Sequence, residues 1–307
     1  MSGPWRSANQ NPEPTKTTKR ESSERMNTSF KPSNSPLRLT NIKSLLLAAL
    51  LLGGLHTAVS QTIYSTRFEP PTFEADLSLV GQDGWIAPPP FSPNAAVVTA
   101  DKPRQGKQSV HVLGEDLVHQ DFINEATAGY YDAIGSYRRP VNYDTGNAQT
   151  IRISAHVRID GPKTASGNNF FSASIAGRAE STFEGGPSSA SVGELAISSD
   201  GHAYAYSGND FAPTFLASKR VKLGEWHNLV IVADFATQTS RFYVDEHLLA
   251  TFSWEPSEVY TGVLLRGSLL AYAAPDTATN HKAAYASHYD KFLIKVVSHD
   301  ECDGDDK

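Results

Sequence analysis

From residue 63 onward, short apolar runs alternate with stretches of Gly, Pro, Asn and Asp, a pattern typical of β strands. The clearest run is Thr150–Ile159, TIRISAHVRI, in which apolar and polar residues alternate strictly. Neighbouring strand residues point to opposite faces, so the isoleucines of this run share one face with Ala155 and Val157, while Arg152, Ser154, His156 and Arg158 share the other. The pattern therefore predicts a sandwich strand with one side on a core and the other side polar.

The same reasoning predicts an all-β chain after residue 60, with no amphipathic helix of ten or more residues. The predicted strands are Ile63–Glu69, Ala95–Ala100, Ser109–Leu113, Ala133–Arg139, Thr150–Ile159, Phe170–Arg178, Val192–Ser198, Ala203–Ser207, Val221–Leu223, Asn228–Phe235, Arg241–Asp245, Leu248–Phe252, Gly262–Ala271 and Tyr285–Val297. Neither an internal repeat nor a linker divides this region. We therefore expect one domain over residues 61–298.

The first sixty residues have a different character. Residues 1–43 are polar and Pro/Ser-rich, which predicts disorder because such a segment cannot bury enough apolar surface. Residues 44–60 hold an apolar block that follows basic residues and ends in Ala58-Val59-Ser60, the order of a secretory signal peptide. The block is too short to span a bilayer, which needs about 20 apolar residues. We expect cleavage near Ser60 and a secreted or periplasmic mature chain without a stable membrane span; an uncleaved anchor and a start at Met26 stay open alternatives.

Charge narrows the classes of partner. The chain has 27 Lys and Arg against 33 Asp and Glu; eight and three of these lie in residues 1–60, which leaves 19 against 30 and a net charge of −11 beyond. Such an acidic protein is poorly suited to nucleic acid or anionic lipid, although it suits cations. Cys302, in the acidic tail 299–307, is the only cysteine, so no intramolecular disulfide can form and stability depends on the core.

Two motifs within Val221–Trp254 carry a family resemblance: Gly224-Glu225-Trp226-His227 at the entry to a strand, and Phe242-Tyr243-Val244-Asp245 in a hairpin. They resemble the concanavalin A-like (LamG-type) jelly-roll domains of exported bacterial proteins, as do Phe68-Glu69 and Tyr289-Asp290-Lys291-Phe292 near the two ends. The resemblance covers residues 63–297 and implies a two-sheet antiparallel sandwich with Trp226 in its core. Glu246 stands where the family's hairpin has glycine, which predicts a different turn type because glycine makes positive φ favourable.

Domains of the family that the chain resembles serve as lectins, glycosidases, lyases or adhesion modules. The resemblance therefore predicts the fold better than the function. We take glycan binding without catalysis as the leading hypothesis, with a polysaccharide or surface glycan as partner. The predicted ligand contacts are Tyr137, Arg158, Tyr204 and Tyr206, because aromatic and polar side chains together suit sugars. Tyr204 and Tyr206 share one face, and alternation does not decide whether that face is solvated or buried. The oligomeric state stays open.

Catalysis is the alternative. A retaining glucanase needs two carboxylates close together on one strand face, and the nearest carboxylate pairs, such as Glu180 and Glu184, do not have that spacing. A polysaccharide lyase needs a group that neutralises a uronate carboxylate and a Tyr or His that moves a proton. His119, Tyr131, Arg138 and His156 are the candidates for that chemistry, so a lyase is favoured over a glucanase.

A calcium-stabilised structural or adhesion module is the third hypothesis. The resemblance implies that a structural Ca²⁺ ties the first strand to the last, with Glu69 and Asp290 at the positions of its ligands. Calcium takes six to eight oxygen ligands, which carboxylates supply. No other cofactor is expected, because the chain lacks zinc-ligand spacing, a nucleophile elbow and a glycine-rich phosphate loop.

Overall fold

The computed structural model describes residues 60–87, 93–117, 133–141, 150–165, 171–183, 186–207, 214–254, 259–260, 265–273 and 284–297. All of them belong to one compact unit, residues 56–307. The side chains at 115, 133–134, 178–183, 186–191, 259–260 and 265–273 are outside the description. So are residues 1–59, with the predicted signal peptide up to Val59, and the acidic tail 299–307.

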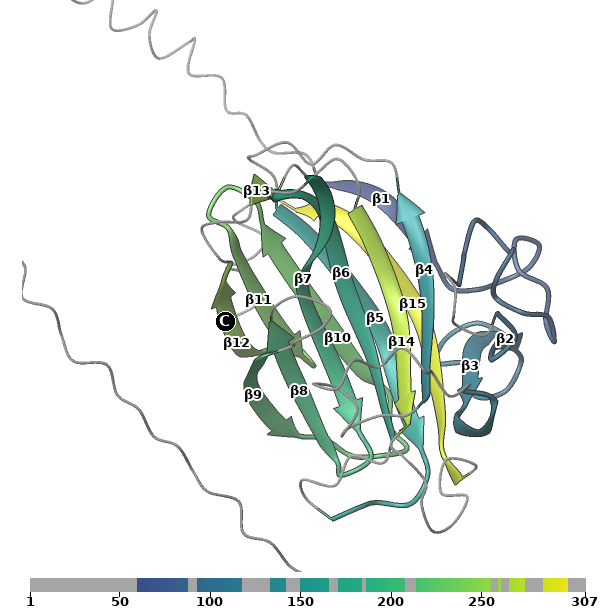
Figure 1. Ribbon diagram of the computed structural model, residues 1–307. Coiled ribbons are helices and arrows are strands. Elements are labelled where there is room, and N and C mark those ends of the chain that lie inside the picture. Colours follow the sequence, from purple (N-terminus) through teal and green to yellow (C-terminus); the bar gives the residue numbers. More distant parts are fainter. Residues whose placement is uncertain are drawn as a thin grey trace, which may run out of the picture. The chain divides into compact units, whose positions relative to one another are not determined.

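The described strands form two antiparallel sheets that face each other (Figure 1). Sheet A has the order β12-β11-β10-β5-β15-β3-β2, and β1 also pairs with β15. Its strands are β1 (Gln61–Thr66), β2 (Ala96–Thr99), β3 (Ser109–Leu113), β5 (Thr150–Asp160), β10 (His227–Asp234), β11 (Thr239–Val244), β12 (His247–Ser253) and β15 (Ala286–Val297). A short 3-10 helix, η1 (Gly114–Asp116), follows β3.

Sheet B has the order β4-β14-β6-β7-β8-β9, and β13 pairs with β6. Its strands are β4 (Ala133–Val141), β6 (Phe171–Phe183), β7 (Gly186–Ser198), β8 (His202–Ser207), β9 (Thr214–Arg220), β13 (Val259–Tyr260) and β14 (Leu265–Ala273). The all-β, two-sheet sandwich predicted from the sequence is confirmed. Over the described stretches, no helix has the length and apolar character that a membrane crossing requires.

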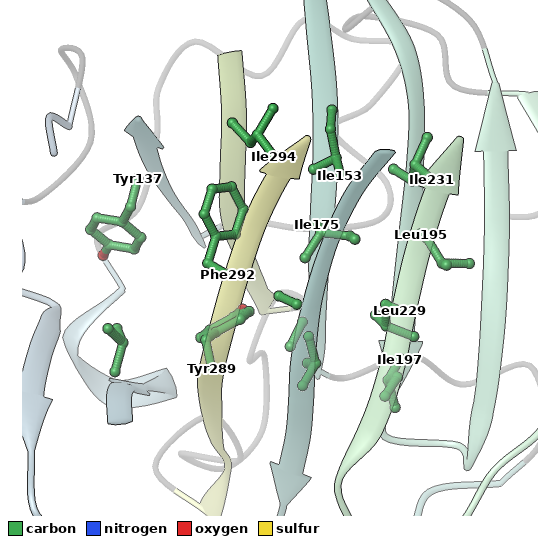
Figure 2. Packing of buried hydrophobic residues seen from close by; sticks show 14 of the residues in the cluster. Tyr137, Ile153, Ile175, Leu195, Ile197, Leu229, Ile231, Tyr289, Phe292 and Ile294 are labelled. Carbon is green, nitrogen blue, oxygen red and sulfur yellow. The ribbon is translucent and has the colours of Figure 1, made fainter. Parts of the chain in front are cut away.

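The core lies between the sheets, and alternation along each strand fills it. Ile153 of β5 and Ile231 of β10 meet Ile175 of β6 there, and all three are fully buried. Figure 2 shows these side chains with Phe292 of β15, which comes from the far end of the chain. Each such side chain removed from water contributes roughly 1.5–3 kcal/mol. A chain that cannot form a disulfide within itself therefore has a continuous apolar layer to hold it together.

One strand was misplaced by the sequence pattern. Residues Val221–Leu223 form no strand, and the strand lies just before them as β9. β9 is the edge of sheet B, and none of its residues is buried. Because neither face of an edge strand needs to be apolar throughout, TFLASKR lacks the alternation that reveals buried strands.

The hairpin between β11 and β12 does not have the different turn type that the missing glycine predicted. Its two loop residues, Asp245 and Glu246, have φ of 51° and 69°, so the turn has the positive φ values of a type I′ hairpin without any glycine. Asp245 accepts hydrogen bonds from the Asn228 backbone N–H (2.8 Å) and from His227 Nδ1 (2.7 Å). His227 Nε2 donates to the Lys222 carbonyl at 2.8 Å. These side-chain contacts hold Asp245 at its positive φ, and Glu246, at the position where the family has glycine, adopts a positive φ as well.

Candidate functional site

The outer face of sheet B carries a row of functional side chains. Strand pairing aligns Phe215 of β9, Tyr206 of β8, Glu194 of β7 and Ala176 of β6, and one position of β14 separates Ala176 from Arg138 of β4. Directly paired residues share a face, so this row crosses the whole sheet. With strands about 4.8 Å apart, it is roughly 24 Å long. That length exceeds a single sugar residue and suits an extended chain.

One end of this row is aromatic. Tyr204, Tyr206 and Phe215, named here the aromatic strip, pack ring on ring outside the core. The Tyr204 and Tyr206 rings are 6.2 Å apart at 30°, and the Phe215 ring meets both edge-on at 6.1 and 6.4 Å. Phe215 is 56% exposed, whereas Ala203 and Ala205, on the other face of β8, are fully buried. The strip therefore faces away from the core.

A buried carboxylate anchors the strip. Asp200, in the turn between β7 and β8, is fully buried and accepts a 2.5 Å hydrogen bond from the Tyr204 hydroxyl. The His202 backbone N–H donates to its other oxygen at 3.1 Å, and His202 Nδ1 lies 3.2 Å from Oδ2. These contacts fix the Tyr204 ring before any ligand arrives, which lowers the entropic cost of binding on it.

Small side chains lie beside the strip. Ser172, Ser174, Ala176, Ala196 and Ser198 point outward from β6 and β7, and each is at most 3% exposed. The Ser174 hydroxyl donates to Glu194 Oε1 at 2.7 Å, which orients the carboxylate at the middle of the row. Glu194 is the only described carboxylate on the strands of this face. The face thus combines apolar rings, hydroxyls and one acceptor.

The residues predicted for catalysis do not come together. Arg138 lies on the outer face of sheet B, where its Nε donates to Ser136 Oγ at 3.3 Å. His156 lies on β5, on the outer face of sheet A, so the core separates the two. His119 and Tyr131 fall outside the described residues. Arg138 and His156 therefore belong to different faces of the molecule and do not share a site.

The predicted ligand contacts are also divided. Tyr204 and Tyr206 belong to the aromatic strip, but Tyr137 is fully buried in the core, as Figure 2 shows from close by. A buried ring has no surface for a ligand, so Tyr137 is not part of the candidate site. Arg158 lies on the other sheet, where its Nε donates to Asp160 Oδ1 at 2.8 Å.

Arg158 belongs to a histidine cluster on the outer face of sheet A that the sequence did not reveal. The rings of His111 (β3) and His288 (β15) stack in parallel, 4.5 Å apart at 7°. His288 is fully buried, and its Nε2 lies 3.1 Å from Asp160 Oδ2, which also accepts a 2.7 Å bond from Lys102 Nζ. His111 and His288 come together because β3 pairs with β15. The sequence alone does not show this long-range pairing.

Burial sets the charge state of this cluster. Desolvation, aided by the nearby His111, lowers the pKa of His288 to about 4, and desolvation also lowers that of His111. Burial raises the pKa of Asp160, but hydrogen bonds from Lys102 and Arg158 outweigh it, so that pKa lies below its usual range. At neutral pH the two stacked imidazoles are therefore neutral beside a charged carboxylate.

Trp226 packs beside this cluster and not in the core. Its ring meets His288 edge-on at 6.4 Å, and the side chain is half-buried on sheet A. The expectation that Trp226 fills the sandwich interior is therefore wrong. Trp85 is the fully buried tryptophan, packed against Phe292 at 5.2 Å.

Glu69 and Asp290 lie near each other, as the family resemblance implies, but they bind backbone N–H groups. Glu69 Oε1 accepts from Lys107 (2.6 Å) and Gln108 (3.2 Å). Asp290, fully buried, accepts from Arg104 and Gln105 through Oδ2 and from Lys291 through Oδ1. Burial raises the pKa of Asp290 despite these bonds.

This donor set does not fit a calcium ion, which needs oxygen ligands where these carboxylates meet N–H groups. The described residues also contain no group of three His, Cys, Asp or Glu side chains that could hold a metal. The two carboxylates instead fasten the loop before β3 to β15 and to the segment after β1. Calcium binding there stays a prediction without support from this geometry.

The comparisons with known proteins bear on the fold alone. No protein-family model matches the sequence, and neither does any curated protein. Similar solved structures include the Emp47p carbohydrate recognition domain (10% identity, 80% of this chain and 100% of that one, TM-score 0.45) and a complex of LamA from Z. galactanivorans with laminaritriose and laminaritetraose (10%, 77% and 99%, 0.46). Another is the family 7 alginate lyase A1-II′ (9%, 65% and 82%, 0.39). The fold of the described residues is the two-sheet antiparallel sandwich that the sequence predicted.

Proposed function

We propose that the chain binds carbohydrate without catalysis, on the aromatic strip of sheet B. The observation that carries this proposal is the strip itself: three rings packed outside the core, with Phe215 more than half exposed. Aromatic rings offer flat apolar surfaces to the C–H faces of sugars, while nearby hydroxyl and carboxylate groups pair with sugar hydroxyls. Exposed aromatic clusters on a soluble sandwich otherwise cost solubility, which favours a binding role.

The arrangement supports an extended glycan lying across the strands. Tyr206 and Phe215 hold one end of the row, and Glu194 stands one strand further in, oriented by Ser174. Arg138 ends the row at the opposite edge, where it adds a cation for an acidic substituent.

Binding assays on two variants test the proposal. Phe215→Ala and Tyr206→Ala should each weaken glycan binding about threefold to tenfold, the worth of one aromatic contact. The control is Leu248→Ala, which removes another large exposed side chain (49%) from sheet A. A glycan array identifies the ligand, and titration calorimetry measures the affinity. Equal loss in the control, or no loss in either strip variant, would contradict the assignment.

An enzyme assay tests the absence of catalysis. Uronate polymers incubated with the protein should show no rise in the ultraviolet absorbance of unsaturated products, and neutral glucans should show no new reducing ends. Product from either polymer would overturn the non-catalytic proposal. Because Arg138 and His156 occupy opposite faces, any lyase chemistry would also need a proton-transfer group other than His156 on the face of sheet B.

We also propose that the protein is exported, because a module that binds a polysaccharide or a surface glycan acts outside the cytoplasm. The predicted signal order in residues 44–60 supports it. The N-terminus of the protein recovered from the medium or periplasm should be Gln61.

A further inference from the structure

A row of basic side chains crosses the outer face of sheet A. Strand pairing aligns four residues from four neighbouring strands: Arg241 (β11), Val232 (β10), Arg152 (β5) and Lys295 (β15). Directly paired residues share a face, and the residues on either side of Arg152 and Lys295 lie in the core, so this row points outward. It is roughly 14 Å long, because neighbouring strands are about 4.8 Å apart. The four positions, named here the basic row, include no carboxylate, although the chain beyond residue 60 has a net charge of −11.

An apolar cluster lies on the same face as the basic row. Four side chains pack together apart from the core, and each is at most 7% exposed: Val230 and Val232 of β10, Tyr243 of β11 and Val297 of β15. Val230 pairs with Tyr243 one step along the strands from the pair of Val232 and Arg241. The outer face of an antiparallel sheet in a two-layer sandwich is ordinarily in contact with water. Burial of this degree on an outer face indicates that the apolar cluster is covered.

The sequence continues from this face into an acidic segment. β15 ends at Val297, whose side chain belongs to the apolar cluster, and the acidic tail 299–307 follows after Ser298. The tail has one lysine and five carboxylates, namely Asp300, Glu301, Asp303, Asp305 and Asp306. At about 3.3 Å per extended residue, Asp300 to Asp305 spans roughly 16 Å, which matches the length of the basic row. The row lies two residues back from the end of β15, so a turn at residues 298–299 is enough to bring the tail over it.

We propose that the acidic tail folds back across the outer face of sheet A, with its carboxylates on the basic row and its backbone over the apolar cluster. Opposite charges meet along the row, and attachment to β15 gives the tail a high effective concentration there. Each exposed ion pair contributes little, but several together favour the docked tail over the detached one by about fivefold to thirtyfold. Salt screens these pairs, so docking weakens as the ionic strength rises. The tail thus occupies sheet A and leaves the aromatic strip, on sheet B, accessible to a ligand.

A spin label tests the position of the tail in the full chain. Cys302 is the only cysteine and lies within the tail, so a nitroxide attached to it broadens the NMR signals of the backbone amides near the tail. The amide signals of Val232 and Arg241 should broaden strongly at about 0.1 M salt, and those of Tyr204 and Ala196 on sheet B much less. At about 1 M salt the difference should shrink. Mixing spin-labelled protein with isotope-labelled protein that carries no nitroxide should give no broadening, because the contact lies within one chain.

Charge reversal tests the basic row itself. Arg152→Glu combined with Arg241→Glu should remove the selective broadening on the outer face of sheet A, because like charges then repel the tail. Adding Asp300→Lys and Asp303→Lys to that variant should restore it, since opposite charges meet again. Melting curves confirm that each variant is folded. If the reversed variant does not fold, Arg152→Gln combined with Arg241→Gln takes its place and should reduce the broadening.

The matched control changes the net charge by the same amount on the other sheet. Lys219→Glu combined with Arg220→Glu reverses two cations on β9, at the edge of sheet B, and should keep the broadening pattern of the wild type. Four results would each overturn the proposal: equal broadening on both sheets in the wild type, selective broadening that survives reversal of the basic row, loss of it in the control, or broadening between separate chains. A detached tail combined with binding of a free acidic peptide to the basic row would overturn it as well.

Discussion

Acidification should destabilise the fold through His288. This imidazole is fully buried on the outer side of sheet A, stacked on His111 and 3.1 Å from Asp160 Oδ2. The charged groups around it are Asp160 and Arg158 on β5 and Asp101 and Lys102 before β3. Asp160 already binds Lys102 and Arg158, so a proton on His288 adds a third cation to one carboxylate.

The size of the effect follows from the shift in pKa. In the unfolded chain His288 titrates near 6.5, and in the folded chain near 4. The folded state therefore binds fewer protons between these values, and stability falls as the pH drops through that window. At about pH 5 the loss from His288 alone is about 2 kcal/mol, and below about pH 4 it levels off near 3 kcal/mol. Above about pH 7 the group contributes no pH dependence.

The assay is urea unfolding of the wild type and of His288→Gln at about pH 7.5 and about pH 5, between which the His288 contribution changes by about 2 kcal/mol. The wild type should lose about 2 kcal/mol more on acidification than the variant, which has no proton to gain. Comparing variants cancels His227, whose pKa is raised because its bond to Asp245 outweighs desolvation. Its stabilising contribution is complete below about pH 6.5 and is lost as the pH rises through its folded pKa.

Two further variants sharpen the comparison. His111→Gln removes the neighbouring charge that helps to lower the pKa of His288. The stability that this variant loses on acidification should therefore lie between the losses of the wild type and of His288→Gln. His247→Gln alters an exposed histidine at the start of β12 and should behave as the wild type does. If His288→Gln loses as much stability on acidification as the wild type, the buried imidazole is not the source of the acid sensitivity.

Three other predictions test the remaining features. Glu246→Gly should stabilise the fold by about 0.5–1 kcal/mol in thermal or urea unfolding, because glycine adopts φ of 69° without strain, whereas Glu246→Ala should change little. Glu69 and Asp290 bind backbone N–H groups, so a chelator should leave the melting temperature unchanged; a clear decrease would restore the calcium site. Asp290→Ala should cost about 2–3 kcal/mol because it removes the charged acceptor of three backbone N–H groups, unless water replaces the carboxylate.

The sequence revealed the fold because burial repeats along each strand. The alternation in Thr150–Ile159 matches the inward isoleucines of β5, and the closing segment Tyr285–Val297 matches β15 almost residue for residue. β9 escaped because an edge strand needs no apolar face. The Asp245–Glu246 turn was also missed, since the contacts that hold its positive φ come from His227 and Asn228 on a neighbouring strand.

The site was harder to predict because alternation shows which residues of a strand share a face, but it does not show which sheet the strand joins. β4 and β5 follow each other in the chain, yet β4 pairs with β14 in sheet B and β5 with β10 and β15 in sheet A. That long-range pairing separates Arg138 from His156 by the thickness of the core. The same pairing brings together His111 and His288, which are remote in the chain.

The aromatic strip shows what settles such an ambiguity. Spacing placed Tyr204 and Tyr206 on one face of β8 but left that face unassigned. The intervening Ala203 and Ala205 do assign it, because their small side chains are fully buried between the sheets and leave the larger rings outside. Phe215, from a strand that the pattern missed, then completes the strip. The burial of the two alanines is visible only in the structure, because alternation alone does not say which face of a strand meets the core. Arg138 across the same row gives the strip a polar counterpart.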